Sequence, residues 1–197
     1  MNVSRETSDK LEHYEATLRK WNPKINLVAK STLADLRARH FEDSAQVFKR
    51  IPKETTRLVD LGSGGGFPGL VIAILAGERG YPLETVLIES DQRKSAFLRT
   101  VLREIETKAT VITDRIEQAP PQNADIITAR ALADLPMLLA HCERHLNPEG
   151  RALFLKGRSW RSEVEDARKQ WNFELDTIQS LTEPDAVLLE IEGAKRV

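Results

Sequence analysis

One stretch of the sequence decides the fold: Leu58-Val59-Asp60-Leu61-Gly62-Ser63-Gly64-Gly65-Gly66-Phe67-Pro68-Gly69. Its first four residues form a short, mostly apolar run that predicts a buried strand, and the glycines after it predict a tight turn. Pro68 then introduces an apolar segment, residues 70–76, which predicts a helix that ends at Gly77. A strand that passes through glycines into a helix can hold a cofactor, because glycine allows close approach and the helix N-terminus offers free N–H groups.

Outward from this stretch, strand and helix patterns keep alternating. Repeated strand–helix units predict a parallel sheet with helices on both faces. The end of the chain differs, because two strand patterns with only a short connection predict an antiparallel hairpin. We therefore expect an α/β fold, a Rossmann-like, doubly wound sheet with an antiparallel C-terminal hairpin. The expected strands are residues 58–61, 85–89, 109–113, 124–128, 151–156, 173–181 and 186–192, and the expected helices between them include residues 92–106 and 135–146.

The first 54 residues have a different pattern, with helices and no strand. Apolar residues spaced by three or four predict a helix over residues 8–21 with Ser8 as its N-cap. A second helix is expected to begin after Lys30 and to end at Pro52. We expect a single domain, 1–197, in which an N-terminal helical extension, 1–54, packs on a Rossmann-like core, 55–197.

The composition excludes several classes of protein. The 197 residues include 29 Lys and Arg against 30 Asp and Glu, and the net charge of −1 excludes a uniformly basic nucleic-acid binder but not a local basic patch. A single cysteine, Cys142, excludes a disulfide framework and a multi-cysteine zinc site, and we expect no metal. No apolar run is long enough to span a bilayer and the N-terminus has no apolar signal segment, so we expect a cytoplasmic protein without a membrane partner.

The charge around the glycines distinguishes between two cofactor classes. Gly64-x-Gly66-x-x-Gly69 matches the dinucleotide fingerprint, which alone is a weak signal. Asp60, however, precedes Gly62 by two residues, and a carboxylate there would repel the pyrophosphate of a nicotinamide cofactor. It would attract the ammonium and sulfonium groups of S-adenosylmethionine. We therefore expect S-adenosylmethionine and a class I methyltransferase fold, with Asp60, Gly62 and Gly64 among the contacts.

Two further strand ends carry side chains that suit this cofactor. Glu89 ends the expected second strand, about 20 residues after the last glycine, where an acid can bind a ribose diol. After the third strand, Ile116 can pack on the adenine ring and Glu117 can meet its exocyclic amine. We expect all three residues to contact the cofactor.

Different methyl acceptors require different catalytic residues, and the residues of this sequence exclude several acceptors. Cys142 lies inside an expected helix, far from any strand end, so it does not suit the cysteine nucleophile of cytosine C5 methylation. The fourth strand ends in Thr128-Ala129-Arg130-Ala131, without the proline-rich clamp of amine methylation and without the aspartate that ribose methylation pairs with a lysine such as Lys156. Guanine N7 needs neither, because its lone pair is free at neutral pH. We therefore expect no catalytic base, and positioning by Arg130 and Lys156.

Basic residues gather in two segments. Residues 24–50 contain six basic and three acidic side chains, and residues 151–161 contain four basic and none acidic. A face built from both would suit a phosphate backbone, although charge runs are often only solvated surface. The residues that we expect to contact RNA are Arg39, His40, Arg93, Lys94, Lys156 and Arg158.

Several motifs, in order along the chain, resemble one known family. Besides the glycine stretch they are Trp21-Asn22-Pro23-Lys24-Ile25-Asn26-Leu27, Arg39-His40-Phe41-Glu42-Asp43-Ser44, Arg93-Lys94-x-x-Phe97-Leu98-Arg99, Ala129-Arg130-Ala131 and Leu155-Lys156-Gly157. With these motifs the chain resembles the small-subunit (16S) ribosomal RNA guanine-N7 methyltransferase family, also called RsmG or glucose-inhibited division protein B.

The resemblance implies a reaction, a partner and a set of contacts. The reaction would transfer a methyl group from S-adenosylmethionine to N7 of a guanine in 16S rRNA near the decoding region. The partner would be free rRNA, the small ribosomal subunit or an assembly intermediate, and we expect the protein to be a monomer. The implied cofactor contacts are Gly62, Phe67, Ile116, Glu117 and Arg130.

Two other functions stay open from the residues alone. A methyltransferase of a small molecule or a protein would have no affinity for RNA, and its pocket would be apolar around Arg130 and Lys156. A nicotinamide-dependent oxidoreductase or a nucleotide-binding module would bind NADH, and S-adenosylmethionine would not change its melting temperature.

Overall fold

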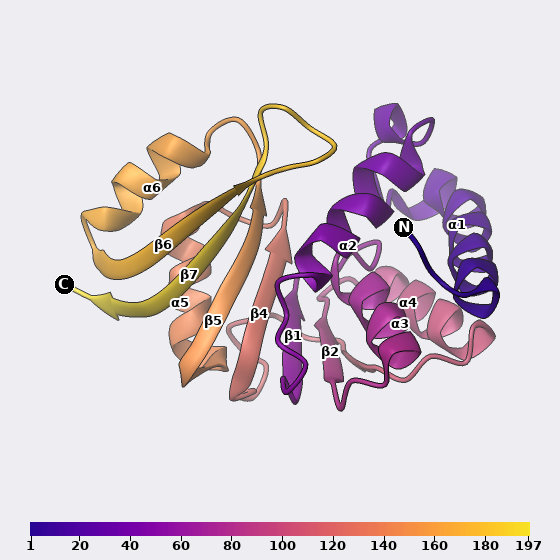
Figure 1. Ribbon diagram of the computed structural model, residues 1–197, viewed down its shortest axis with the longest axis horizontal. Coiled ribbons are helices and arrows are strands. Elements are labelled where there is room, and N and C mark those ends of the chain that lie inside the picture. Colours follow the sequence, from indigo (N-terminus) through magenta and orange to yellow (C-terminus); the bar gives the residue numbers. More distant parts are fainter.

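A computed structural model describes residues 1–197 and contains a seven-stranded sheet in the order β3-β2-β1-β4-β5-β7-β6 (Figure 1). Strands β1 to β5 pair in parallel, whereas β7 pairs antiparallel with both β5 and β6. The expected Rossmann-like sheet with an antiparallel C-terminal hairpin is therefore confirmed. The strands are β1 Arg57–Leu61, β2 Glu84–Ile88, β3 Thr110–Ile112, β4 Ala124–Arg130, β5 Leu146–Lys156, β6 Trp171–Gln179 and β7 Val187–Arg196.

The strand order reverses between β1 and β4, and this reversal decides where a ligand can bind. The chain passes from β1 outward to β2 and β3, and then returns to place β4 and β5 on the other side of β1. In such sheets a crevice opens at the carboxyl ends of the strands beside the reversal. The glycine loop, which we define as residues 62–69, and the segment after β4 both leave the sheet at this edge.

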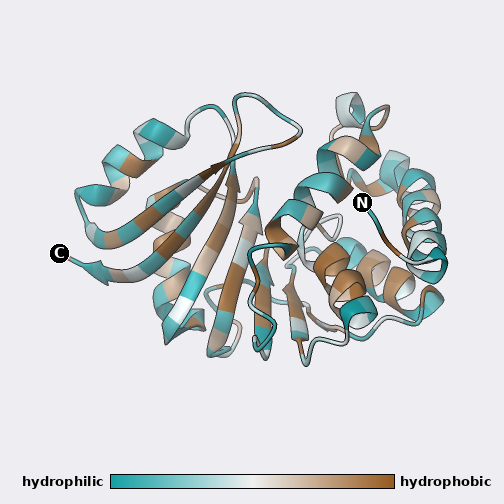
Figure 2. Cartoon of the chain, in the orientation of Figure 1, coloured by the Kyte–Doolittle hydropathy of each residue, from teal (hydrophilic) through white to brown (hydrophobic).

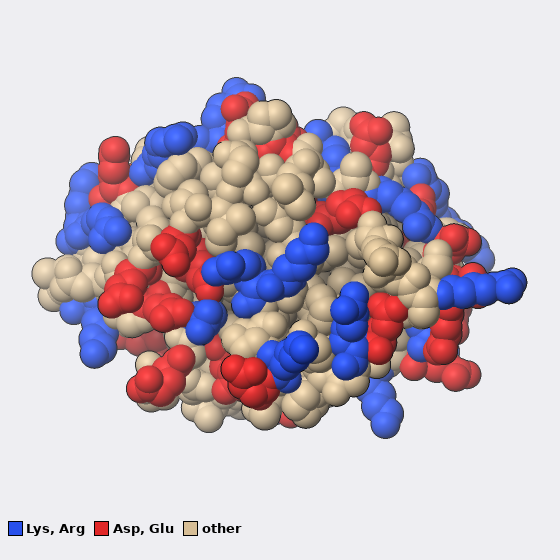
Figure 3. All heavy atoms as spheres, in the orientation of Figure 1, with Lys and Arg blue, Asp and Glu red and all other residues tan.

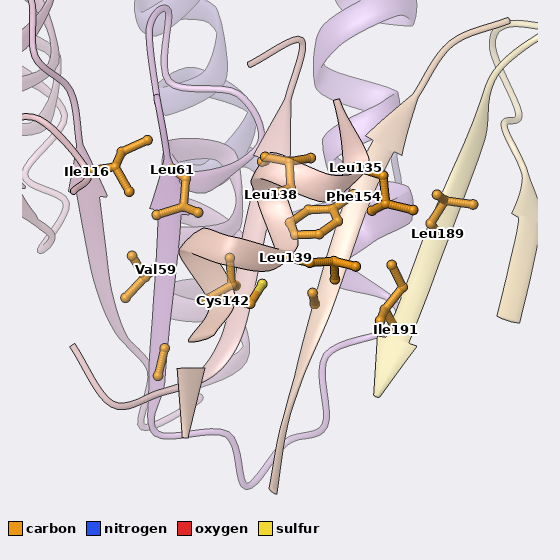
Figure 4. Packing of buried hydrophobic residues seen from close by; sticks show 14 of the residues in the cluster. Val59, Leu61, Ile116, Leu135, Leu138, Leu139, Cys142, Phe154, Leu189 and Ile191 are labelled. Atoms are coloured by element: carbon orange, nitrogen blue, oxygen red, sulfur yellow. The ribbon is translucent and has the colours of Figure 1, made fainter. Parts of the chain in front are cut away.

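The central strands of the sheet are largely hydrophobic (Figure 2), and buried hydrophobic residues form a cluster on each face of the sheet. On one face, α5 Leu135–His145 and α6 Trp160–Arg168 pack on alternate strand residues, and Leu139 and Phe154 lie in the middle of this cluster (Figure 4). On the other face, α3 Gly69–Arg79 and α4 Gln92–Glu104 share a cluster with N-terminal residues such as Leu11 and Phe41. The N-terminal helices are thus part of the same core as the sheet.

The N-terminal region differs from the sequence prediction. Its first helix begins earlier, because the hydroxyl of Ser4, and not that of Ser8, accepts the N–H of Thr7 as N-cap. The second expected helix is broken, because a wider π-helical turn places both His40 and Phe41 in the interior. The elements are α1 Arg5–Ile25, a 3₁₀ turn η1 Lys30–Thr32, the π-helical turn η2 Arg37–Glu42, and α2 Asp43–Phe48.

Two other predictions were wrong. Helix α3 continues through Gly77, and the left-handed residue that ends it is Gly80, with φ of +65°. Helix α6 was not predicted at all, because only Val164 and Ala167 are buried in it and its apolar pattern is weak. No helix of the chain is long and apolar enough to cross a membrane, and no group of three or more His, Cys, Asp or Glu side chains could hold a metal ion.

Candidate active site

The glycine loop turns sharply between β1 and α3, and two of its glycines are required by their surroundings. Gly66 has φ of +95°, and a Cβ there would overlap the hydroxyl of Tyr14. At Gly69, a Cβ would lie 2.5 Å from the Cβ of Asp60, because α3 packs directly on β1. The loop can therefore follow this path only with glycine at both positions.

A cavity of about 560 Å³, which we call the glycine-loop cavity, opens at the carboxyl ends of β1 and β2. Five of the residues predicted to bind the cofactor line it: Gly62, Gly64, Glu89, Ile116 and Glu117. Its volume lies within the usual range for small-molecule sites. The structure thus gathers residues from three loops that are up to 55 positions apart in the sequence, since Glu117 follows Gly62 by that number.

Glu89 is fixed by the backbone on both sides. One carboxylate oxygen, Oε2, accepts the N–H of Gly64 at 2.8 Å, and the other, Oε1, accepts the N–H of Asp91 at 2.8 Å. A carboxylate oxygen can accept more than one hydrogen bond, so both oxygens keep capacity for a ligand. Glu89 therefore joins the glycine loop to the end of β2 and presents a rigid acceptor to the cavity.

Helix α5 holds the opposite wall. The Nε2 of His145 donates to the carbonyl of Ile116 at 2.8 Å, and Arg144 donates to the carbonyl of Ala119 at 2.8 Å and 3.1 Å. Burial lowers the pKa of His145, which keeps its ring neutral. Ile116 is buried while Glu117 stays exposed at the rim, so the two side chains offer one apolar and one polar surface.

Asp60 lies beneath the glycine loop and not at its mouth, where it was expected. The side chain is fully buried, its Oδ1 accepts the hydroxyl of Thr128 at 2.7 Å, and its Oδ2 has no hydrogen-bond partner. Burial raises the pKa of Asp60 to about 6, although the hydroxyl of Thr128 opposes this shift. An unpaired buried carboxylate oxygen favours a positive charge nearby.

A second cavity of about 320 Å³, the helix-side cavity, lies on the other side of the glycine loop. Phe67 and Arg130 line it, and it shares Gly62, Gly64 and Lys94 with the glycine-loop cavity. The two cavities therefore meet along the loop. The predicted cofactor residues are divided between them, with Asp60 alone lining neither.

An N-terminal helix supports the loop at this point. The hydroxyl of Tyr14 in α1 donates to the carbonyl of Gly65, and its ring stacks on Phe67 with centroids 5.4 Å apart. Burial raises the pKa of Tyr14 well above its ordinary value, so the hydroxyl keeps its proton. The position of Phe67 is thus set by α1 as well as by the loop.

A directed chain of hydrogen bonds links η1 and η2 to β4. Arg130 can only donate, so His40 must accept at Nδ1 and carry its proton at Nε2. That Nε2–H donates to the hydroxyl of Thr32 at 2.9 Å, which in turn donates to the carbonyl of Ala29 at 2.8 Å. Burial, with Arg130 and Arg39 adding to it, lowers the pKa of His40 to about 3. His40 is therefore a neutral residue that orients Arg130.

A third cavity, of about 750 Å³, lies between η2, the end of β4 and the β6–β7 connection, and we call it the hairpin-loop cavity. Arg39, Asp43, Arg130 and Glu183 are among the charged residues on its walls. Figure 1 shows the β6–β7 connection extending across the edge of the sheet toward the N-terminal helices. This cavity, the glycine-loop cavity and the helix-side cavity all touch Ala131, whose φ is +50°.

The residues predicted to contact RNA are not equally free. Arg39 forms an ion pair with Glu183, and Lys156 is engaged by Glu163 and by the carbonyl of Ala133 at 2.7 Å. The expected place of His40 on an RNA-binding surface does not fit the structure, because its ring is buried and both ring nitrogens are bonded.

The remaining basic residues are more accessible. The side chain of Arg158 is 88% exposed, 3.5 Å from Asp185, and that of Arg93 is exposed beside Asp91. Lys94 lines two cavities and makes no ion pair or side-chain hydrogen bond. On the face shown in Figure 3, basic and acidic side chains are interspersed.

Residues 7–188 match the family model described as rRNA small subunit methyltransferase G. The chain belongs to this family. It is 55% identical to the ribosomal RNA small subunit methyltransferase G of Ruegeria pomeroyi over 197 residues, which are 100% of this chain and 96% of the relative. It is 48% identical to the protein of that name in Paracoccus denitrificans over 196 residues, 99% of each chain.

Solved structures agree with the methyltransferase G family on the fold. A TehB-like SAM-dependent methyltransferase from Corynebacterium glutamicum has a TM-score of 0.62 at 15% identity, over 93% of this chain and 99% of the other. A SAM dependent methyltransferase from Aquifex aeolicus has a TM-score of 0.61 at 14% identity, over 90% and 96%. At these identities the likeness establishes the class I methyltransferase fold alone.

Three residues that contact the candidate site were not singled out from the sequence. Tyr14 belongs to the apolar stripe of α1, Asp43 is one of two acids in a motif, and Thr128 lies in a β-branched strand, so none of them carries a local signal. The interpretation of Cys142 as a packing residue is confirmed, because it is buried and burial raises the pKa of its thiol to about 12.

Proposed function

We propose that the chain transfers a methyl group from S-adenosylmethionine to N7 of a guanine in 16S rRNA, near the decoding region. The observation that carries this proposal is the meeting of three cavities at Ala131. Two of them share the glycine loop and can hold the two ends of one elongated cofactor. The third and largest opens beside them and can hold the acceptor. Membership of the methyltransferase G family supports the choice of substrate.

The residues present fit S-adenosylmethionine. Glu89 offers rigid acceptors for the ribose hydroxyls, Ile116 an apolar surface for adenine, and Glu117 a carboxylate for its amine. Phe67 and Arg130 would meet the methionine end in the helix-side cavity.

Asp60 would favour the cationic end of the cofactor through its charge from beneath the loop, because its Oδ2 has no other partner. When bound, the cofactor supplies an electrophilic methyl group on a sulfonium. Gly62 and Gly64 allow it close approach to the loop backbone.

This chain's own residues would position the acceptor without removing a proton. Guanine N7 carries a free lone pair, so orientation and exclusion of water account for the catalysis. Arg130, oriented by His40, would hold the base. Lys156, bonded to the carbonyl of Ala133, would hold the wall between the cofactor and the acceptor in place.

We propose that the partner is 16S rRNA in free form, in the small subunit or in an assembly intermediate, and that the protein is a cytoplasmic monomer. Residues 1–197 would act as one domain, with the helical extension 1–54 packed on the core 55–197, which the shared cluster around Leu11 and Phe41 supports. Arg39, Arg93, Lys94 and Arg158 would contact the phosphate backbone.

The test uses purified protein, S-adenosylmethionine with a tritiated methyl group, and small-subunit rRNA that lacks the modification. We expect label in 7-methylguanosine after digestion and chromatography, and fragment mapping then identifies the nucleotide. Parallel reactions contain free rRNA or assembled subunits. Label in another nucleoside would contradict the acceptor atom, and cofactor binding without any RNA label would favour a small-molecule or protein acceptor.

A further inference from the structure

Two charged residues that line the hairpin-loop cavity, Arg130 and Asp43, each have one terminal atom with a hydrogen-bond partner and one without. Arg130 uses one guanidinium nitrogen, Nη2, for His40, and its other nitrogen, Nη1, has no hydrogen-bond partner. The Oδ1 of Asp43 accepts the hydroxyls of Ser180, at 3.1 Å, and of Thr182, whereas its Oδ2 accepts none. The two open atoms, Nη1 and Oδ2, lie 4.0 Å apart.

Both side chains are largely removed from water but border this cavity. The side chain of Asp43 is 11% exposed and that of Arg130 is 19% exposed. At 4.0 Å the two atoms are too far apart for a hydrogen bond. Polar groups in such surroundings nearly always have a partner. The cavity wall thus presents one open acceptor, the Oδ2 of Asp43, and beside it an unpartnered donor, the Nη1 of Arg130, that neighbouring atoms cover.

We infer that Asp43 and Arg130 together select guanine, with the Oδ2 of Asp43 accepting N1–H and the Nη1 of Arg130, uncovered as the base enters, donating to O6. The inference rests on the proposed function. These groups are neighbours on the Watson–Crick edge of guanine, whereas adenine and cytosine present a donor and an acceptor in the reverse order. Uracil has the same order as guanine, but it has no N7 to methylate.

The charge of Asp43 also suits the reaction. Methylation at N7 places a positive charge on the purine, and this makes N1–H a stronger donor. The contact with the Asp43 carboxylate therefore strengthens as the methyl group is transferred. His40 is neutral, so it orients Arg130 without adding a second positive charge beside the base.

The neighbourhood keeps Asp43 in a fixed orientation. Gln46, one turn later in α2, donates through Nε2 to the carbonyl of Gln179 at 2.7 Å and accepts the N–H of Leu181 at 3.0 Å. These bonds hold the β6–β7 connection against α2, and the hydroxyls of Ser180 and Thr182 then fix the Oδ1 of Asp43. The bonds to Oδ1 therefore fix the carboxylate of Asp43, while its other oxygen, Oδ2, accepts no hydrogen bond.

The test measures methylation of rRNA ligated to carry guanosine, inosine or 2-aminopurine at the nucleotide that mapping identifies. Inosine keeps O6 and N1–H, whereas 2-aminopurine has no O6 and has an acceptor at N1. We expect the wild-type protein to methylate inosine within a few-fold of guanosine, and 2-aminopurine about 100-fold more slowly or less. Asp43→Asn should lower kcat/KM on guanosine and inosine by about 10- to 100-fold, without changing the rate on 2-aminopurine.

Two variants control for structure. Glu42→Gln makes the same chemical change one residue earlier and should leave all three rates unchanged. Thr182→Val removes one bond to Oδ1 but keeps the open oxygen, so it should keep the discrimination even where it lowers the rate. Calorimetry should give the same S-adenosylmethionine affinity for Asp43→Asn as for wild type, because Asp43 lines neither cavity of the glycine loop.

The outcomes separate this inference from the proposed function. An equal loss on all three bases in Asp43→Asn, or no loss on guanosine, overturns the role of Asp43 while the methyltransferase assignment stands. Loss of discrimination in Thr182→Val would show that the shape of the wall, and not the open oxygen, selects the base. Absence of methyl transfer to guanosine by the wild-type protein overturns the proposed function, and this inference with it.

Discussion

The glycine-loop cavity and the hairpin-loop cavity lie next to each other but are built in different ways. In the first, the carboxyl ends of β1 and β2 place Glu89 against the N–H of Gly64, and the bonds run between a side chain and the nearby backbone. In the second, side chains meet across the chain, as Asp43 and Thr182 do over 139 positions. The proposed cofactor side thus follows from the order of the strands, whereas the proposed acceptor side depends on pairs of distant residues.

The largest expected effect is that of replacing Asp60, which lies beneath the glycine loop on the proposed cofactor side. Its pKa is raised to about 6, so the folded chain holds this proton more tightly than the unfolded chain, and the contribution of Asp60 to stability should increase as the pH falls from about 6 to 4. Asp60→Asn mimics the protonated acid and should raise the free energy of unfolding at pH 8 by about 3 kcal/mol, with no gain near pH 4.

The same variant should bind S-adenosylmethionine more weakly, because the charge beneath the glycine loop is lost. Urea denaturation at several pH values and calorimetry measure the two effects. If the gain in stability of Asp60→Asn over wild type is no larger at pH 8 than at pH 4, the buried, unpaired state of Asp60 is contradicted.

Glu89→Ala tests whether cofactor binding can be weakened without weakening RNA binding. Both N–H groups that Glu89 holds would lose a charged acceptor, so the affinity for S-adenosylmethionine should fall about 30-fold, or about 2 kcal/mol. RNA retention in a filter-binding assay should not change. Glu84→Ala removes an exposed acid at the other end of the same strand and should leave cofactor affinity unaltered. A parallel fall in RNA binding would mean that the two sides are not separable.

His40, which lines the helix-side cavity and orients Arg130, should give the opposite dependence on pH. Its pKa is lowered to about 3, so below about pH 6.5 the unfolded chain binds a proton that the folded chain does not. The contribution of His40 to stability is therefore lost as the pH falls from about 6.5 toward 3, and about 1.5 kcal/mol of it is lost by pH 5 after allowance for its partial exposure. His40→Gln cannot titrate and should show a flatter profile in the same denaturation series. An unchanged slope would contradict the neutral state of the ring.

The smallest expected effect tests the link between α1 and the cofactor side. Tyr14→Phe leaves the carbonyl of Gly65 without its donor and should cost about 1 kcal/mol of stability, with a few-fold loss of cofactor affinity. Tyr81→Phe is the matched control, because the ring of Tyr81 packs on Phe48 and its hydroxyl makes no hydrogen bond. Equal effects of the two variants would contradict a specific role of α1 in holding the glycine loop.

The same division explains what could be predicted from the sequence. Every strand of the sheet was expected, because short apolar runs and glycine turns are local signals, and Glu89 and Ile116 follow from their positions at strand ends. Asp43 was missed, because its partners lie more than 130 residues later. Lys156 was expected to contact RNA, but its ion pair with Glu163 was not foreseen, because Glu163 lies in α6, a helix too polar to be recognised.

The bonds between α2 and the β6–β7 connection can form only late in synthesis of the chain. The hydrogen-bond partners of Asp43 and Gln46 lie 133 to 139 positions later in the chain. A ribosome needs roughly ten seconds to synthesise that length. All residues that line the glycine-loop cavity, up to His141, are made before that. The residues that line the proposed cofactor site are therefore synthesised before those of the β6–β7 connection, and a chain truncated before Ser180 would lack the contacts that orient Asp43.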